Sequence, residues 1–364
     1  MQKEFEDLWK IFPDNSLKGR TWHWWWWLFF FENPERPEYP RQLMILWGTR
    51  NCKKVRINDF LWLPAMIPKV QENHAEFESV VASWYCDGEK THEPFILEKG
   101  ATETDWGDGH GSIKMESERG SYTFHGKDAD FTLKAENPNV GVDLRMVKWN
   151  DEMAKLIPTG RVFLGNLNMG YTMLKYRALL THGKIRQGDE TIDVKGRAYF
   201  QKVRISSITP SWYWATIQWD SGAYMQYFLL HAGIPMLRQQ YSHNINFDWG
   251  EKFIGKTLNF YDPNEKKEHQ LKDVQVSKRY ENDLPIFKVT AKDGDIKLMA
   301  EMATYGRCCW NITQPLIWPF WLGVFYNEYP ARLIDFKYRN GSKKYGMEDM
   351  GKCYCNCEHT WGAV

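Results

Sequence analysis

The sequence lacks a strong net charge, a long hydrophobic run and an even set of cysteines. In 364 residues, 47 Lys and Arg are balanced by 46 Asp and Glu, so the net charge of +1 provides no global field that would attract nucleic acid. The seven cysteines are an odd number, and the charged first ten residues do not resemble a secretory signal. We therefore expect reduced thiols and a cytoplasmic location.

Motifs for a metal or a phosphate are also missing. Cys353, Cys355 and Cys357 alternate instead of following the C-x-x-C spacing typical of zinc sites, so we expect small buried side chains on one strand face. The glycine-rich segment 105–112 has no Lys-Ser/Thr and no helical pattern after it, which argues against a phosphate loop. A surface hairpin is expected there, with calcium binding as the alternative. We expect no metal and no cofactor.

Aromatic residues are abundant: they make up 16% of the chain, and 19 residues are Trp. Residues 22–31, WHWWWWLFFF, are too short to span a membrane, which needs roughly 20 apolar residues, and prolines and charges follow. On a strand, Trp22, Trp24 and Trp26 point to one face while Trp25 and the other odd-numbered residues point to the opposite face. One face would pack against a partner barrel or a covering segment, and the other would line a barrel interior. Whether these rings hold a ligand or only fill a core stays open.

Short alternating segments separated by Gly, Asn, Asp and Pro predict an all-β protein. The exception is the N-terminal segment, where Phe5, Leu8, Trp9 and Phe12 predict one short amphipathic helix before Pro13. This helix would cap the fold, with contact to a membrane surface as the alternative.

A weak internal repeat predicts two tandem β-barrels. Each half begins with W-[HY]-W, at Trp22 and at Trp212, and each ends with a related strand, GRAYFQ (196–201) or GKCYCN (351–356). The expected organisation is a helical cap, a first barrel and a second barrel, covering residues 1–21, 22–203 and 204–364.

The two-barrel layout, the aromatic opening strand and GRAYFQKVRISSITPSWYWATIQWDSGAYMQYFLLH (196–231) together resemble the carotenoid hydratase (hydroxyneurosporene synthase) and AttH-like superfamily. The resemblance implies two tandem lipocalin-like antiparallel barrels. It also implies a cofactor-independent hydratase, a hydro-lyase that adds water to a double bond of an isoprenoid chain, such as a carotenoid or a geranylgeranyl lipid. At positions where that family often carries an acid or histidine, this sequence has Gln201 and Lys202.

Such chemistry needs a general acid, a wall that tolerates a carbocation and a bound water. Aromatic faces attract a cation by roughly 0.5–2 kcal/mol each. We expect at least one barrel to hold an elongated apolar pocket for the substrate. The expected substrate-binding residues are Trp24, Trp26, Tyr199, Trp212, Tyr213 and Trp214.

The candidate acids come from the start of the second barrel, where the family resemblance implies the site. They are Tyr241, His243, Asp248 and Asp220. For Asp220, the alternative to a catalytic role is a place in an exposed hairpin turn. For the segment 239–250, the alternative is an ordinary polar loop.

Two other functions stay open at this point. The barrels could carry an apolar ligand or lipid without altering it, or they could form a cofactor-free isomerase or cyclase acting on a terpenoid or polyketide-like substrate. The expected partner is in each case an apolar small molecule and not nucleic acid. Peripheral membrane contact stays open, and the oligomeric state cannot be predicted.

Overall fold

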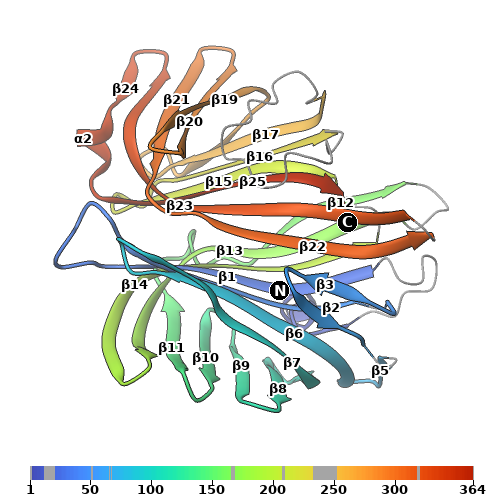
Figure 1. Cartoon of the computed structure of the whole chain (residues 1–364). Coiled ribbons are helices and arrows are strands. Elements are labelled where there is room, and N and C mark those ends of the chain that lie inside the picture. The colour runs from blue at the N-terminus through green and yellow to red at the C-terminus, as the bar shows by residue number, and fades with distance from the viewer. Residues whose placement is uncertain are drawn as a thin grey trace.

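Strands dominate the computed structural model, which confirms the all-β prediction. The structure describes residues 2–11, 21–50, 52–64, 66, 68–164, 169–206, 210–232, 252–317 and 320–363. Two antiparallel sheets lie one above the other, with the N-terminal half of the chain mainly in one sheet and the C-terminal half in the other (Figure 1).

The helix and the strands of the first sheet come mainly from the first half of the chain. They are α1 (Gln2–Asp7), β1 (Thr21–Phe31), β2 (Arg41–Arg50), β5 (Lys69–Val70), β6 (His74–Cys86), β7 (Thr91–Gly107), β8 (His110–Ser117), β9 (Ser121–Lys127), β10 (Asp130–Glu136), β11 (Val140–Lys148), β12 (Ile157–Leu164), β13 (Met169–Gln187) and β14 (Glu190–Ser206).

The second sheet takes two short strands from the first half and all strands of the second half. Its elements are β3 (Val55–Ile57), β4 (Phe60–Trp62), β15 (Ser211–Trp219), β16 (Tyr224–Ala232), β17 (Lys252–Asp262), β18 (Lys267–Leu271), β19 (Asp273–Glu281), β20 (Leu284–Asp293), β21 (Ile296–Thr304), β22 (Cys308–Ile317), β23 (Phe320–Asn340), β24 (Lys343–Tyr345), the helix α2 (Met347–Met350) and β25 (Cys353–Ala363).

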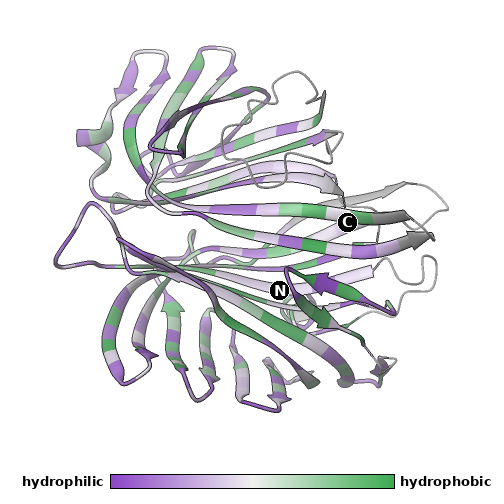
Figure 2. Ribbon diagram, viewed as in Figure 1, coloured by the Kyte–Doolittle hydropathy of each residue, from purple (hydrophilic) through white to green (hydrophobic). Residues whose placement is uncertain are grey.

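The first sheet closes into a barrel. In the described chain, ten strands form a ring in the order β11-β10-β9-β8-β7-β6-β2-β1-β14-β13, and β13 pairs back onto β11. The second sheet curls in the same way, so that β17 approaches β19 and β18 approaches β20. Hydrophobic and hydrophilic residues alternate along β9, β10 and β11, as expected for strands with one face in a core and one in water (Figure 2).

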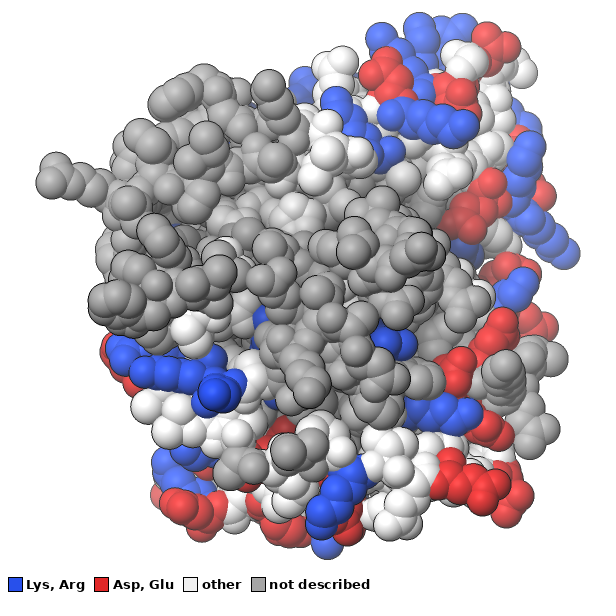
Figure 3. Space-filling model, turned by 90° about the vertical axis from the view of Figure 1, so that its right-hand side faces the viewer, with Lys and Arg blue, Asp and Glu red and all other residues white. Residues whose placement is uncertain are grey.

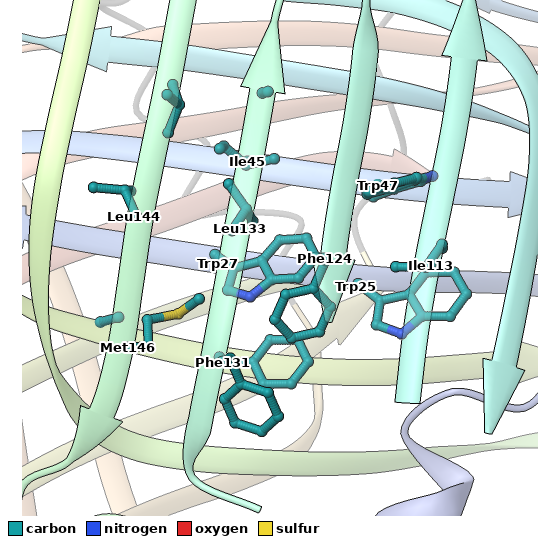
Figure 4. Packing of buried hydrophobic residues seen from close by; sticks show 14 of the residues in the cluster. Trp25, Trp27, Ile45, Trp47, Ile113, Phe124, Phe131, Leu133, Leu144 and Met146 are labelled. Carbon is teal, nitrogen blue, oxygen red and sulfur yellow. The ribbon is translucent and has the colours of Figure 1, made fainter. Parts of the chain in front are cut away.

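The two faces of β1 have different partners. The odd-numbered side chains Trp25 and Trp27 point into the first barrel, where they pack with Phe124 and Phe131 from β9 and β10 (Figure 4). The even-numbered side chains, including Trp26, belong to a separate apolar cluster between the two sheets. This confirms that one face lines a barrel interior and the other faces the partner barrel.

The N-terminal segment caps the first barrel. Helix α1 is followed by Leu8 and Trp9, both fully buried, and the Trp9 ring lies 4.9 Å from the ring of Phe124. Trp25 Nε1 donates a hydrogen bond of 2.7 Å to the Leu8 carbonyl, which fixes the segment to β1. Phe12 lies outside the described residues.

The two halves share the register expected of a repeat. Trp24 on β1 pairs with Val203, four residues after Tyr199, and Trp214 on β15 pairs with Glu358, four residues after Tyr354. The motif glycine at position 196 has a steric cause, because a Cβ there would lie 1.9 Å from the Phe30 carbonyl oxygen.

One feature of the fold is absent from the sequence prediction. Strands β3 and β4 leave the first half of the chain and join the second sheet, where β3 pairs with β22. The apolar residues of this excursion, Val55, Ile57 and Trp62, are buried in the cluster between the sheets. The excursion therefore ties the two halves together.

Candidate functional site between the sheets

A cavity of about 400 Å³ lies between the two sheets. Strands β1, β2, β6, β13 and β14 form one wall, and the facing wall comes from the second sheet, mainly β15, β16, β22 and β23. This differs from the expectation of a pocket inside a barrel. Bulky rings such as Trp27 and Phe200, stacked 5.1 Å apart, pack in the interior of the first barrel, whereas this cavity lies outside that interior.

Four predicted substrate-binding tryptophans line this inter-sheet cavity: Trp24, Trp26, Trp212 and Trp214. The rings of Trp26 and Trp214 meet edge to face, with centroids 5.5 Å apart and planes at 85°. The two tryptophan strands thus contribute to one surface, although they come from different sheets.

The two predicted tyrosines lie differently. Tyr199 is fully buried behind the wall, with its ring 5.6 Å from Trp26 and 5.5 Å from Trp214. Tyr213 points to the other face of β15, into the second core, and stacks on His359 at 3.9 Å. Strand alternation separates Tyr213 from its two Trp neighbours, so it belongs to the second core and not to the cavity wall.

None of the four predicted acids is found at this cavity among the described residues. Asp220 is exposed in a turn and forms an ion pair with Arg197, which agrees with the turn interpretation. Tyr241, His243 and Asp248 lie outside the described residues.

A pair of buried glutamates is the main chemical feature of the cavity. Glu358 on β25 is one of the lining residues, and Glu328 on β23 is its direct partner in the antiparallel register. Opposite residues in such a pair have Cβ atoms about 5 Å apart. We call Glu328 and Glu358 the glutamate pair.

Each carboxylate of the pair accepts hydrogen bonds from aromatic side chains. Glu358 accepts from Trp212 Nε1 at 2.7 Å and from the Tyr326 hydroxyl at 2.8 Å. Glu328 accepts from Trp26 Nε1 at 3.4 Å and from Trp84 Nε1. Among the described residues, no Lys, Arg or His forms an ion pair with either glutamate.

Burial without a counterion favours the protonated form of these groups. Burial raises the pKa of Glu358 to about 7, although the hydrogen bonds from Trp212 and Tyr326 act in the opposite direction. Burial, and next the charge of Glu358, raises the pKa of Glu328 well above its usual value. Two carboxyl groups this close titrate as a coupled pair, so we expect the pair to hold at least one proton near neutral pH.

Sequence reasoning missed the glutamate pair, although part of the signal was present. Because Cys353, Cys355 and Cys357 share one strand face, Tyr354, Asn356 and Glu358 must share the other. Cys355 and Cys357 are buried in the second core, and Glu358 consequently faces the first sheet. Glu328 had no local signal, since its role depends on pairing with a strand 30 residues later in the chain.

The opposite side of the cavity carries a base. Lys175 on β13 lines the cavity and donates a hydrogen bond to Gln226 Oε1 on β16. Burial, and next the charge of Arg177, lowers the pKa of Lys175 to about 7, while Glu268 acts in the opposite direction. The cavity therefore has an acidic side and a basic side, with aromatic rings between them.

Metal ligands, disulfides and membrane helices contribute nothing to the site within the described part of the chain. No group of three His, Cys, Asp or Glu residues there could hold a metal ion, and all seven cysteines are free thiols. No described helix is both long and apolar enough to cross a membrane.

On the face shown in Figure 3, basic and acidic side chains are interspersed around the edge of the described surface.

No protein-family model matches the sequence, and no curated protein sequence matches it significantly. Two solved structures align with the backbone of this chain over most of its length. A protein assigned as AttH, from Nitrosomonas europaea, is 10% identical, with a TM-score of 0.49 over 94% of this chain and 93% of the other. Kievitone hydratase from Nectria haematococca is also 10% identical, with a TM-score of 0.42 over 97% of this chain and 90% of the other.

Proposed function

We propose that this protein is a cofactor-independent hydratase that adds water to a carbon–carbon double bond of an isoprenoid substrate held between the two sheets. One observation supports the proposal above all: a buried glutamate pair at an aromatic wall, with no basic partner among the described residues. A carboxyl group that stays protonated near neutral pH is the type of group that general acid catalysis on an alkene requires.

Glu358 is the proposed general acid, because it is the member of the pair that lines the cavity. Its proton would be transferred to one alkene carbon, leaving a tertiary carbocation on the other and a carboxylate on Glu358. Glu328 is a proposed positioning residue. Whether Glu328 is ionised or protonated controls how readily Glu358 gives up its proton.

The aromatic wall would stabilise the cation. Trp26, Trp212 and Trp214 surround the cavity near Glu358, and ring faces attract a positive charge without reacting as a base would. Water would then attack the cation, and the Glu358 carboxylate would take back one proton from that water. The net reaction is the addition of one water, and the acid is regenerated.

An isoprenoid fits the composition of the cavity. Most of the lining is aliphatic or aromatic, including Met44, Leu46 and Val203. Burial of a hydrocarbon chain against such a wall contributes about 25 cal/mol per Å². The same wall would suit an apolar ligand that is bound but not altered, so the test must separate the two functions.

The test is incubation of the purified full chain with isoprenoid alkenes, followed by mass spectrometry for a mass gain of one water. The matched variants are Glu358→Gln, which keeps the shape but removes the acid, and Glu301→Gln, a β21 glutamate that pairs with Arg279 outside the cavity. We expect product with the wild type and with Glu301→Gln, and at least a 100-fold loss with Glu358→Gln.

Alkene binding should survive Glu358→Gln, because the apolar contacts are unchanged. Binding without any hydration by the wild type would contradict the proposal and favour a ligand carrier. Unchanged hydration by Glu358→Gln would show that another residue is the acid.

A further inference from the structure

We propose that Lys175 and Gln226 form an anion-binding subsite that selects isoprenoid substrates carrying a weak-acid head group such as a carboxylate. The inference rests on the proposed function, since it places the head group of the same substrate whose double bond meets Glu358. It adds a specificity determinant on the far side of the cavity.

The first observation is the isolation of the amine. Of the residues known to line the cavity, Lys175 is the one base and Glu358 the one acid. Lys175 is only 3% exposed, and Gln226 is the one hydrogen-bond partner that the described structure gives its amine. An ammonium group has three donors, so the amine retains capacity for a ligand.

The second observation is that Gln226 is held in one orientation. Its Nε2 donates to the Tyr199 hydroxyl at 3.2 Å, and that hydroxyl donates to Gln201 Oε1 at 2.9 Å. The carbonyl oxygen of Gln226 is consequently directed at Lys175. This network fixes the amine at the cavity wall before any ligand arrives.

The third observation is the missing counterion. The nearby Glu268 forms an ion pair with Arg177, and no ion pair with Lys175 occurs among the described residues. Burial of an ammonium without a partner is costly, and a ligand carboxylate would supply that partner. An anionic ligand would then bind together with a proton taken up by the amine.

The fourth observation is the separation of the two sides. Gln226 lies on β16 and Glu358 on β25, with β15 between them. At about 4.8 Å per strand, the two sides lie about 10 Å apart across the sheet. A substrate with its acidic group at Lys175 would thus present a double bond further along its chain to Glu358.

The experiment compares the binding of farnesoic acid and farnesol to the full chain by isothermal titration calorimetry at pH 6. These ligands share one hydrocarbon chain and differ in the head group. We expect the wild type to bind the acid at least 10-fold more tightly than the alcohol. Lys175→Met and Lys175→Gln should both lose this preference while retaining affinity for the alcohol.

The matched control is Lys202→Met. Lys202 is also buried, but it lies over the Trp25 ring on the other face of the first sheet, so the same substitution there should preserve the preference. A second readout needs no variant: above pH 7 the wild-type preference should decline, because the amine then requires a proton that the solution no longer supplies. The pH at which the preference declines depends on the pKa of Lys175, and the charged neighbours that act on this pKa are Arg177 and Glu268.

Equal binding of the two ligands by the wild type, or a preference that survives both Lys175 variants, would overturn the inference. Its failure differs from failure of the proposed function. Hydration without an acid preference would refute the subsite alone, whereas an acid preference without hydration would refute the hydratase and leave the subsite standing.

Discussion

Replacement of Glu358 by Gln should change how the stability of the protein depends on pH. The pKa of Glu358 rises from 4.5 to about 7 on folding, because the side chain is buried. A group with a raised pKa contributes stability that is fully present below its unfolded pKa and is lost as the pH rises through its folded pKa. For Glu358 this window runs from about pH 4.5 to about pH 7.

The magnitude follows from the same values. One pKa unit corresponds to about 1.4 kcal/mol, so ionisation of Glu358 costs about 3 kcal/mol of folding free energy once the pH exceeds 7. Glutamine is neutral at every pH, and its carbonyl oxygen can still accept from Trp212 or Tyr326. The variant therefore avoids this cost.

The assay is urea denaturation of wild type and Glu358→Gln between pH 4.5 and pH 8. Titrating groups far from residue 358 behave alike in both proteins, so the difference between the two curves reports the glutamate pair: the lost ionisation of Glu358 and the easier ionisation of Glu328 once the charge of Glu358 is gone. We expect Glu358→Gln to gain about 3 kcal/mol relative to wild type across that range. A difference that stays constant with pH would refute the reasoning, because Glu358 would then have an ordinary pKa in the folded protein.

Four further substitutions test the positions that the structure assigns to these side chains. Trp214→Ala should weaken both alkene binding and hydration by at least 10-fold, whereas Tyr213→Phe, on the opposite face of the same strand, should leave alkene affinity unchanged in calorimetry. Asp220→Asn should retain hydration activity in the mass-spectrometry assay, because its carboxylate is exposed in a turn and pairs with Arg197 instead of lining the cavity; loss of activity would return Asp220 to the list of acids. Trp9→Ala should cost about 3–5 kcal/mol in the same denaturation assay, since its ring is fully buried in the first barrel, and a loss below 1 kcal/mol would show that the segment does not cap it.

The sequence was informative wherever the two-residue alternation along a strand decides on which face a side chain lies. The alternation in WHWWWWLFFF predicted that Trp25 and Trp26 would belong to different environments, and the structure places them in two separate clusters. The same rule, applied to W-Y-W, would have separated Tyr213 from Trp212 and Trp214. It could not indicate which face was the barrel interior, because both faces are apolar.

The chemistry of the cavity depends on contacts between distant parts of the chain. Glu328 meets Glu358 through strand register, and Lys175 meets Gln226 across the space between the sheets. A single sequence carries no signal for either encounter. The pairing of β3 with β22 has the same origin, since a three-residue strand has too few residues to show a period.

The most direct test of the central claim is a hydration reaction run in D₂O with the wild-type full chain and an isoprenoid alkene. If Glu358 protonates the double bond, its exchangeable proton will be a deuteron, and the hydrated product will carry one deuterium bound to carbon. We predict this label with wild type and at least 100-fold less product with Glu358→Gln. A product without carbon-bound deuterium, or a labelled product formed equally by Glu358→Gln, would contradict the account.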